Sequence, residues 1–104
     1  MTHPSKRKGN GFERELVMLA KAFGLRSQRA YASNGMSLGL AEEVDLVVDE
    51  WRVQAKRRKK LPSYLRIPKG CDIVATRMDN AECLVLIPFR RFLELVKARR
   101  DGLK

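Results

Sequence analysis

Apolar and polar positions along the chain predict a helix near each end. Residues 11–23 carry apolar side chains at helical spacing, with Asn10 placed to cap the start and Gly24 placed to end the helix. The same spacing returns over residues 89–100 and predicts a second helix. Each helix would have one apolar face with which to cover a sheet.

Apolar runs between the two helices predict strands. The segment 33–43 is rich in glycine and small polar residues, which is typical of a mobile loop, and residues 62–70 predict a short helical or irregular connection. The predicted strands span residues 25–33, a hairpin over 44–58, and 71–78 and 82–89 around a second turn.

The order of these elements is helix, three strands, connection, two strands and helix. This order predicts an α/β fold with a single mixed β-sheet flanked by helices. A chain of 104 residues has room for one hydrophobic core. We therefore expect one domain over residues 11–100, preceded by a flexible basic arm over residues 1–10.

The charge of the chain indicates a partner. Lys and Arg number 22 against 12 Asp and Glu, a formal net charge of +10, which is typical of a protein that binds nucleic acid. No apolar run approaches membrane-spanning length, so a membrane partner is not expected. Residues 1–11 lack the apolar middle of a secretory signal, which predicts a cytoplasmic protein. Cys71 and Cys83 match no zinc or redox spacing and are expected to be buried reduced thiols.

The hairpin predicted over residues 44–58 carries candidate catalytic residues on one face. If Asp49 and Glu50 form its two-residue turn, the numbers of paired residues sum to 99, and Asp45 faces Gln54. Lys56 lies two residues beyond Gln54 and leaves the same face. The opposite face would carry apolar or small residues: Leu46, Val48, Trp51, Val53 and Ala55.

A carboxylate beside an amide oxygen suits Mg²⁺, which takes a few protein oxygens and keeps water or phosphate as its other ligands. Lys56 would then orient the attacking water or stabilise charge on the phosphate. The same residues equally fit a solvated strand face. A second carboxylate would favour the metal site, and the first helix offers Glu13 and Glu15, which lie on opposite borders of its apolar stripe. Periodicity does not choose between them.

Three stretches resemble one known family, in the family's order: "KGNGFERELV" over residues 8–17, "RAYASNG" over 29–35, and "VDLVV" followed by "WRVQAK" over 44–56. The resemblance is to the archaeal-type Holliday junction resolvases, small dimeric endonucleases of the superfamily named for its PD-(D/E)xK motif. It covers about residues 6–60, and beyond them only the pattern of strand, strand and helix agrees. It implies a restriction-endonuclease-like core, in a protein of a prokaryote or of a virus acting in the cytoplasm of its host.

The resemblance also implies a site, and it selects Glu13 over Glu15. The implied catalytic residues are Glu13, Asp45, Gln54, Lys56 and Ser33. The implied ligands of Mg²⁺, with Mn²⁺ as a substitute, are Glu13, Asp45, Gln54 and the backbone carbonyl of Ala55. The family usually has Glu or Asp where this chain has Gln54. We interpret the change as a tolerated variant with weaker metal affinity, because Gln keeps a ligand oxygen but no charge.

The expected activity is resolution of four-way DNA junctions by paired, nearly symmetric cuts, carried out by a homodimer that matches the two-fold junction. The last two strands and the final helix are the expected dimer interface. Cations would track phosphates without reading bases. The expected DNA-binding residues are Lys8, Arg14, Arg29, Arg52, Arg57, Arg58, Lys59 and Lys60. Two alternatives stay open: a nuclease for flaps or other branched DNA, and a non-catalytic nucleic-acid-binding protein on a nuclease fold.

Overall fold

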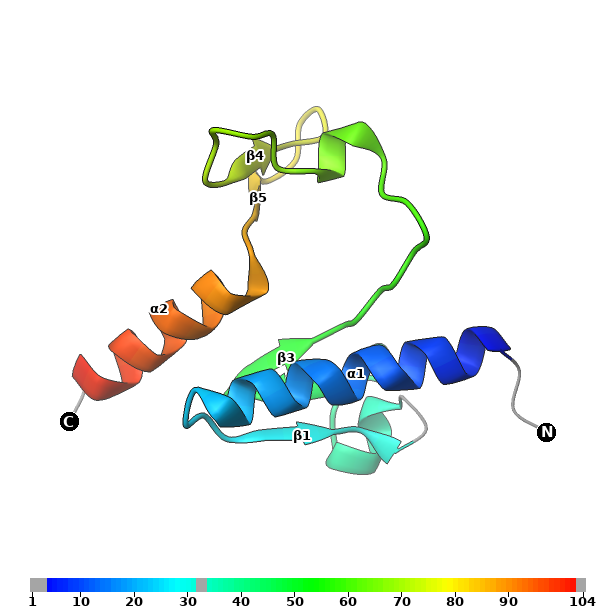
Figure 1. Ribbon diagram of the computed structural model, residues 1–104. Coiled ribbons are helices and arrows are strands. Elements are labelled where there is room, and N and C mark those ends of the chain that lie inside the picture. Colours follow the sequence, from blue (N-terminus) through cyan, green and yellow to red (C-terminus); the bar gives the residue numbers. More distant parts are fainter. Residues whose placement is uncertain (1–3, 32–33, 103–104) are drawn as a thin grey trace. The chain divides into compact units, whose positions relative to one another are not determined.

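The structure is a computed structural model that describes residues 4–31 and 34–102 (Figure 1). The chain divides into two compact units, Met1–Arg57 and Arg58–Lys104. The elements follow the predicted order of helix, three strands, connection, two strands and helix. The prediction of an α/β fold is therefore confirmed at the level of class.

The first unit is a three-stranded antiparallel sheet with one long helix against it. The order of its strands is β1-β2-β3, and α1 contacts β1 and β2. Figure 1 shows α1 running along β1. The elements are α1 (Pro4–Ala22), β1 (Ser27–Arg29), the 3-10 helix η2 (Gly35–Leu38), β2 (Leu46–Val48) and β3 (Trp51–Val53).

The core of this unit lies between α1 and the middle strand. Leu46 and Val48 of β2 are completely buried, and so is Ala20 of α1. Leu16 is also buried, one turn earlier on the same face of the helix. The expected apolar face of the hairpin is thus buried on the central strand, whereas Trp51 on the edge strand keeps 43% of its surface exposed.

The end of α1 follows the sequence prediction at Gly24. Its φ of 78° is a left-handed conformation that glycine adopts without strain. The peptide N–H of Leu25 donates to the carbonyl of Ala20 at 3.0 Å, and that of Gly24 donates to the carbonyl of Lys21 at 2.9 Å. This pair of hydrogen bonds satisfies carbonyl groups that the last helical turn leaves open.

The start of α1 differs from the prediction. The helix begins at Pro4, so residues 4–10, expected within a flexible arm, are helical. Proline fits this position because its fixed φ suits the first helical turn and its missing N–H has no intrahelical partner there. The glycines at 9 and 11 lower helix propensity, and for that reason the pattern favoured a later start.

The hairpin register is the predicted one. Leu46 pairs with Val53 and Val48 pairs with Trp51, so paired numbers sum to 99. Asp49 and Glu50 form the turn, and Asp49 has a φ of 49°, as tight hairpin turns require. A two-residue turn allows only one register between the two strands, so the pairing could be predicted from the sequence.

The segment after β1 is more regular than predicted. It contains η2, whose start is capped by Asn34: the Asn34 side chain accepts a hydrogen bond from the Met36 N–H. Gly35 is buried, and a Cβ added there would meet the Ala41 carbonyl and lie 2.8 Å from Cβ of Val44. The glycine in this segment therefore permits close packing of backbone on backbone.

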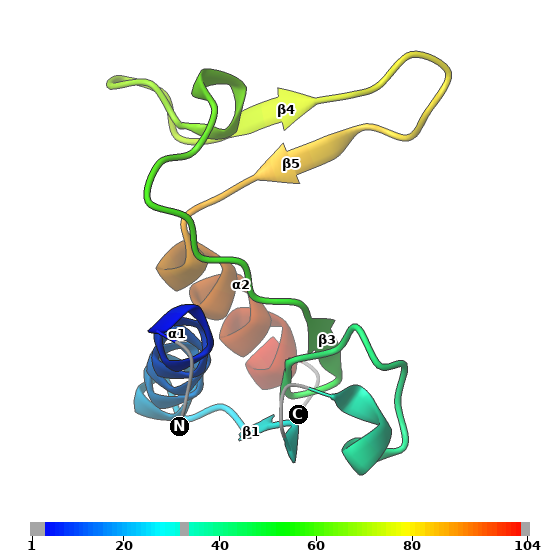
Figure 2. The same cartoon turned by 90° about the vertical axis from the view of Figure 1, so that its right-hand side faces the viewer.

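The second unit contains a short antiparallel hairpin and a helix. Figure 2 shows β4 and β5 as neighbouring strands of opposite direction, with Val74 paired to Leu86. The elements are the 3-10 helix η3 (Ser63–Leu65), β4 (Val74–Thr76), β5 (Leu84–Leu86) and α2 (Phe89–Gly102). The predicted connection, second hairpin and final helix all appear.

Two expectations about sheet and thiols were wrong. The strands do not form one mixed sheet, because β1-β2-β3 and β4-β5 are separate and both are antiparallel. The turns within the hairpins are too short for the crossover that parallel neighbours need. Cys71 and Cys83 are exposed free cysteines, since one precedes β4 and the other lies in the connection to β5, in a two-stranded hairpin that has little interior of its own. Over the described residues, no helix is long and apolar enough to cross a bilayer.

Candidate functional site

Asp45 lies at the open end of the β2–β3 hairpin and is bound on both sides. Its N–H donates to the Val53 carbonyl at 2.9 Å, and its carbonyl accepts from the Ala30 N–H at 2.8 Å. Its side-chain Oδ2 accepts from the Ala55 N–H at 2.7 Å. Asp45 keeps only 9% of its surface exposed. Backbone and side chain together fix this carboxylate between the two neighbouring strands.

The burial of Glu13 distinguishes it from Glu15. Glu13 retains 4% of its surface, whereas Glu15 is exposed. The Glu13 carboxylate faces Arg29 of β1, with 3.6 Å between Oε2 and the arginine Nε. Of the two glutamates that periodicity left open, Glu13 is the one that the helix turns toward the sheet.

A continuous set of contacts connects the two buried carboxylates. Glu13 pairs with Arg29, and the next residue, Ala30, bonds to the backbone of Asp45. Asp45 in turn bonds to Ala55 through its side chain. These residues therefore gather at one end of the three-stranded sheet, although they come from a helix and three different strands or their extensions.

Gln54 and Lys56 flank Ala55 beyond the end of β3, and both are exposed. Among the described residues, no group of three or more His, Cys, Asp and Glu side chains could by itself hold a metal ion. Glu13 and Asp45 would have to be supplemented by amide or carbonyl oxygens. These donors suit Mg²⁺ for two reasons. The hydrogen bond from the Ala55 N–H leaves most of the acceptor capacity of the Asp45 carboxylate unused, and Mg²⁺ needs few protein ligands because it keeps several waters.

Most of the expected DNA-binding cations present their side chains to solvent. Arg29 is the exception, since its side chain is 24% exposed and pairs with Glu13. Lys8 lies in α1, and Ser33 falls outside the described residues. The exposed cations are Arg14, Arg52 and Arg57 in the first unit and Arg58, Lys59 and Lys60 in the second.

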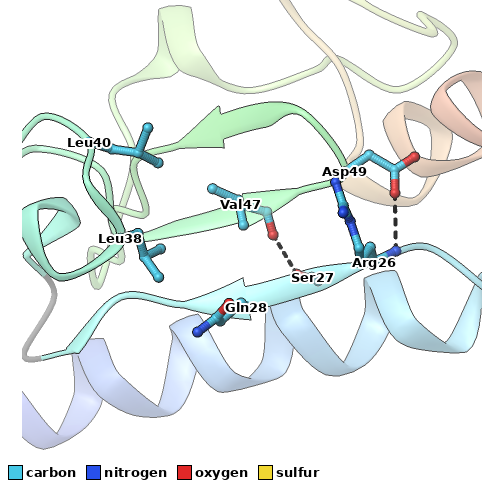
Figure 3. Close-up of a pocket in the computed structure, with 7 residues that line it drawn as sticks. All are labelled: Arg26, Ser27, Gln28, Leu38, Leu40, Val47 and Asp49. Atoms are coloured by element: carbon cyan, nitrogen blue, oxygen red, sulfur yellow. Dashed lines mark hydrogen bonds between the residues drawn. The ribbon is translucent and has the colours of Figure 1, made fainter.

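A hollow of about 300 Å³ lies beside β1 and β2 (Figure 3), and neither Glu13 nor Asp45 lines it. Ser27 donates its hydroxyl to the Val47 carbonyl at 2.7 Å, and the Arg26 N–H donates to Asp49 Oδ1 at 3.1 Å. Leu38 of η2 contributes an apolar wall. The hollow contains none of the predicted catalytic residues, and its two hydrogen bonds join the β1 segment to β2 and to the hairpin turn.

The contact that sequence reasoning missed is the ion pair of Glu13 and Arg29. Both residues were named, one as a metal ligand and the other as a phosphate contact. Nothing in the spacing indicates that they meet, because 16 positions separate them and the pairing depends on how α1 is rotated on the sheet. Comparison of the chain with models of known families, with curated proteins and with solved structures gives no match.

Proposed function

We propose that this protein is a metal-dependent, structure-specific endonuclease that resolves four-way DNA junctions by paired phosphodiester cuts in the cytoplasm. The observation that supports it best is the buried Asp45, tied to Ala55 across the hairpin and linked through Ala30 and Arg29 to the buried Glu13. Burial of two carboxylates at one end of a small basic sheet is unfavourable because they lose hydration, and the core could be formed without it.

Each residue of the site has a proposed role. Glu13 and Asp45 hold Mg²⁺, or Mn²⁺ in its place, through carboxylate oxygens, and Gln54 and the Ala55 carbonyl add neutral oxygens. A metal ion held by these residues would supply Lewis acidity at the scissile phosphate and would activate water. Lys56, exposed beside this group, orients the attacking water or stabilises negative charge on the phosphate.

The basic residues supply binding without sequence recognition. Arg14, Arg52 and Arg57 are exposed and available to phosphates, as are the cations over 58–60. Ser33, which falls outside the described residues, is kept in the proposal as a catalytic residue on the family resemblance alone. Contacts of this kind position a duplex by charge and shape, which suits a branched substrate with no required sequence.

Self-association is part of the proposal, because paired cuts in a two-fold junction need two active sites. Its support is the exposed apolar surface of the second unit. Leu84 and Val85 of β5 are 63% and 57% exposed, and Leu95 of α2 is 57% exposed. Sedimentation velocity tests the homodimer directly.

A non-catalytic DNA-binding protein is the second candidate, and Gln54 is the observation that favours it. Gln54 is exposed and uncharged where the resolvases usually have a carboxylate. Such a protein would hold a junction equally well in Mg²⁺ and in chelator. Cleavage of flaps or other branched DNA would use the same site and differ only in substrate.

The deciding experiment uses an end-labelled four-way junction beside a linear duplex of the same sequence, with Mg²⁺ or EDTA. Paired nicks in the junction alone, lost in EDTA and in Asp45→Asn, are expected. Asp49→Asn is the matched control, since Asp49 lies in the same hairpin and its replacement keeps an oxygen for the Arg26 N–H. Tight binding with no nick in Mg²⁺ or Mn²⁺ would favour the binding protein.

A further inference from the structure

The ion pair between Glu13 and Arg29 differs from the other ion pairs of the described residues. The partners in the pair of Arg91 with Glu94 keep 65% and 50% of their side chains exposed, and they are neighbours on α2. In the pair of Arg29 with Glu13 the exposures are 24% and 6%, and the pair joins α1 to the sheet. A half-buried cation thus lies against a buried carboxylate that the proposed function assigns to a metal ion.

The geometry of this pair is loose. The 3.6 Å between Nε of Arg29 and Oε2 of Glu13 exceeds the 2.7–3.2 Å of a well-formed N–H···O bond. The contact is therefore mainly an attraction of charges. Arg29 also keeps about a quarter of its side chain in solvent, so its five N–H donors can reach a new acceptor without opening the core.

Two cations cannot share one buried carboxylate without repelling each other. We propose that Arg29 is a displaceable counter-ion: it neutralises Glu13 while the metal is absent and turns to a DNA phosphate when the metal binds. This inference rests on the proposed function and adds a coupling to it. Because binding free energies are reciprocal, a metal that releases Arg29 strengthens DNA binding, and DNA that engages Arg29 strengthens metal binding.

The first test measures Mn²⁺ binding by isothermal titration calorimetry in the absence of DNA. Arg29→Gln removes the competing cation and is expected to bind Mn²⁺ about tenfold more tightly than the wild type. Arg29→Lys keeps the charge and should remain close to the wild type. The matched control is Arg26→Gln, since Arg26 is exposed near the same strand and meets Asp49 through its backbone. Equal affinity in Arg29→Gln and Arg26→Gln would overturn the inference.

The second test needs no metal. In EDTA, Glu13→Gln should free Arg29 and tighten binding of a fluorescein-labelled junction about fivefold. Glu15→Gln makes the same change of charge on the exposed side of α1 and should have a smaller effect. The gain should disappear in Glu13→Gln combined with Arg29→Gln, which a double-mutant cycle measures. A gain that persists in the double variant, or that Glu15→Gln reproduces, would contradict the role given to Arg29.

The results separate the two proposals. If the wild type binds Mn²⁺ and Asp45→Asn abolishes that binding, the metal site stands, and an unchanged affinity in Arg29→Gln removes only the counter-ion. If the wild type binds no Mn²⁺, the metal-dependent nuclease and the counter-ion are both wrong. Circular dichroism melts of each variant verify that altered binding does not come from unfolding.

Discussion

The N–H of Ala55 donates to Oδ2 of Asp45 at 2.7 Å, across the open end of the β2–β3 hairpin. The bond holds the chain after β3 against the residue before β2, at the point where the regular ladder has ended. A carboxylate that accepts an amide N–H has its orientation fixed before any ligand arrives. The consequence is a preformed end of the hairpin, with Gln54 and Lys56 on either side of the bonded residue.

Asp45→Ala should destabilise the protein by about 2 kcal/mol, the usual value of a hydrogen bond to a charged group. Asp45→Asn keeps an oxygen for the Ala55 N–H and should lose clearly less. Equilibrium unfolding in urea measures both free energies. Equal losses in the two variants would show that the hydrogen bond contributes little to stability.

Gln54→Glu should preserve cleavage and lower the Mg²⁺ concentration required for half-maximal rate. The added carboxylate supplies the charge that the site lacks beside Asp45. Gln28→Glu is the matched control, because Gln28 is an exposed strand residue away from the hairpin end. A Gln54→Glu variant that needs more Mg²⁺ than the wild type would refute the view of Gln54 as a weak ligand.

Gly35→Ala should destabilise the first unit by roughly 1–3 kcal/mol, the range for overpacking a tight contact. The new methyl group would press on the Ala41 carbonyl and on Val44. Gly11→Ala offers the contrast, since nothing lies within 4 Å of a Cβ there and alanine favours a helix by about 0.5–1 kcal/mol. The melting temperature should fall in Gly35→Ala and rise in Gly11→Ala. An unchanged melting temperature in Gly35→Ala would show that η2 shifts to accommodate the methyl group at little cost.

Arg58→Ala should weaken binding to all DNA sequences and reduce the slope of log affinity against log salt by about 1, as expected for one lost phosphate contact. Fluorescence anisotropy between low and moderate salt measures the slope. Arg99→Ala, an exposed arginine of α2, removes the same charge and should leave the slope nearly unchanged. Similar slopes in the two variants would show that the cations over residues 58–60 act only through the net charge of the protein and not through contacts with phosphates.

Much of the fold could be predicted because local rules determine it. A two-residue turn at Asp49 and Glu50 fixes the register of the hairpin, and a glycine with positive φ at Gly24 ends the first helix. The arrangement of strands into sheets could not be predicted. Short alternating segments show that a strand exists but not which strand it pairs with, so a single mixed sheet was inferred where two antiparallel sheets occur.

The candidate site could be predicted only in its hairpin half. The register of β2 and β3 follows from the turn, but the observed pairing ends at Leu46 and Val53, and Asp45 bonds to Val53 and Ala55. The facing of Asp45 and Gln54 stays a prediction. Spacing did not choose between Glu13 and Glu15, because the choice depends on the rotation of α1 on the sheet, and in the sequence only the family resemblance named Glu13. The pairing of Glu13 with Arg29 could not be predicted for the same reason, because a contact between a helix and a strand depends on packing rather than on periodicity.

The turn of the hairpin lies at the opposite end from the proposed metal site. Three residues of β3 lie between Glu50 and the level of Asp45, which makes four steps of 3.4 Å and a span of about 14 Å, and Glu50 is exposed. The backbone of Arg26 anchors the turn through Asp49, in both directions. A fluorophore attached at position 50 could therefore report on the approach of a labelled junction without entering the site that it monitors.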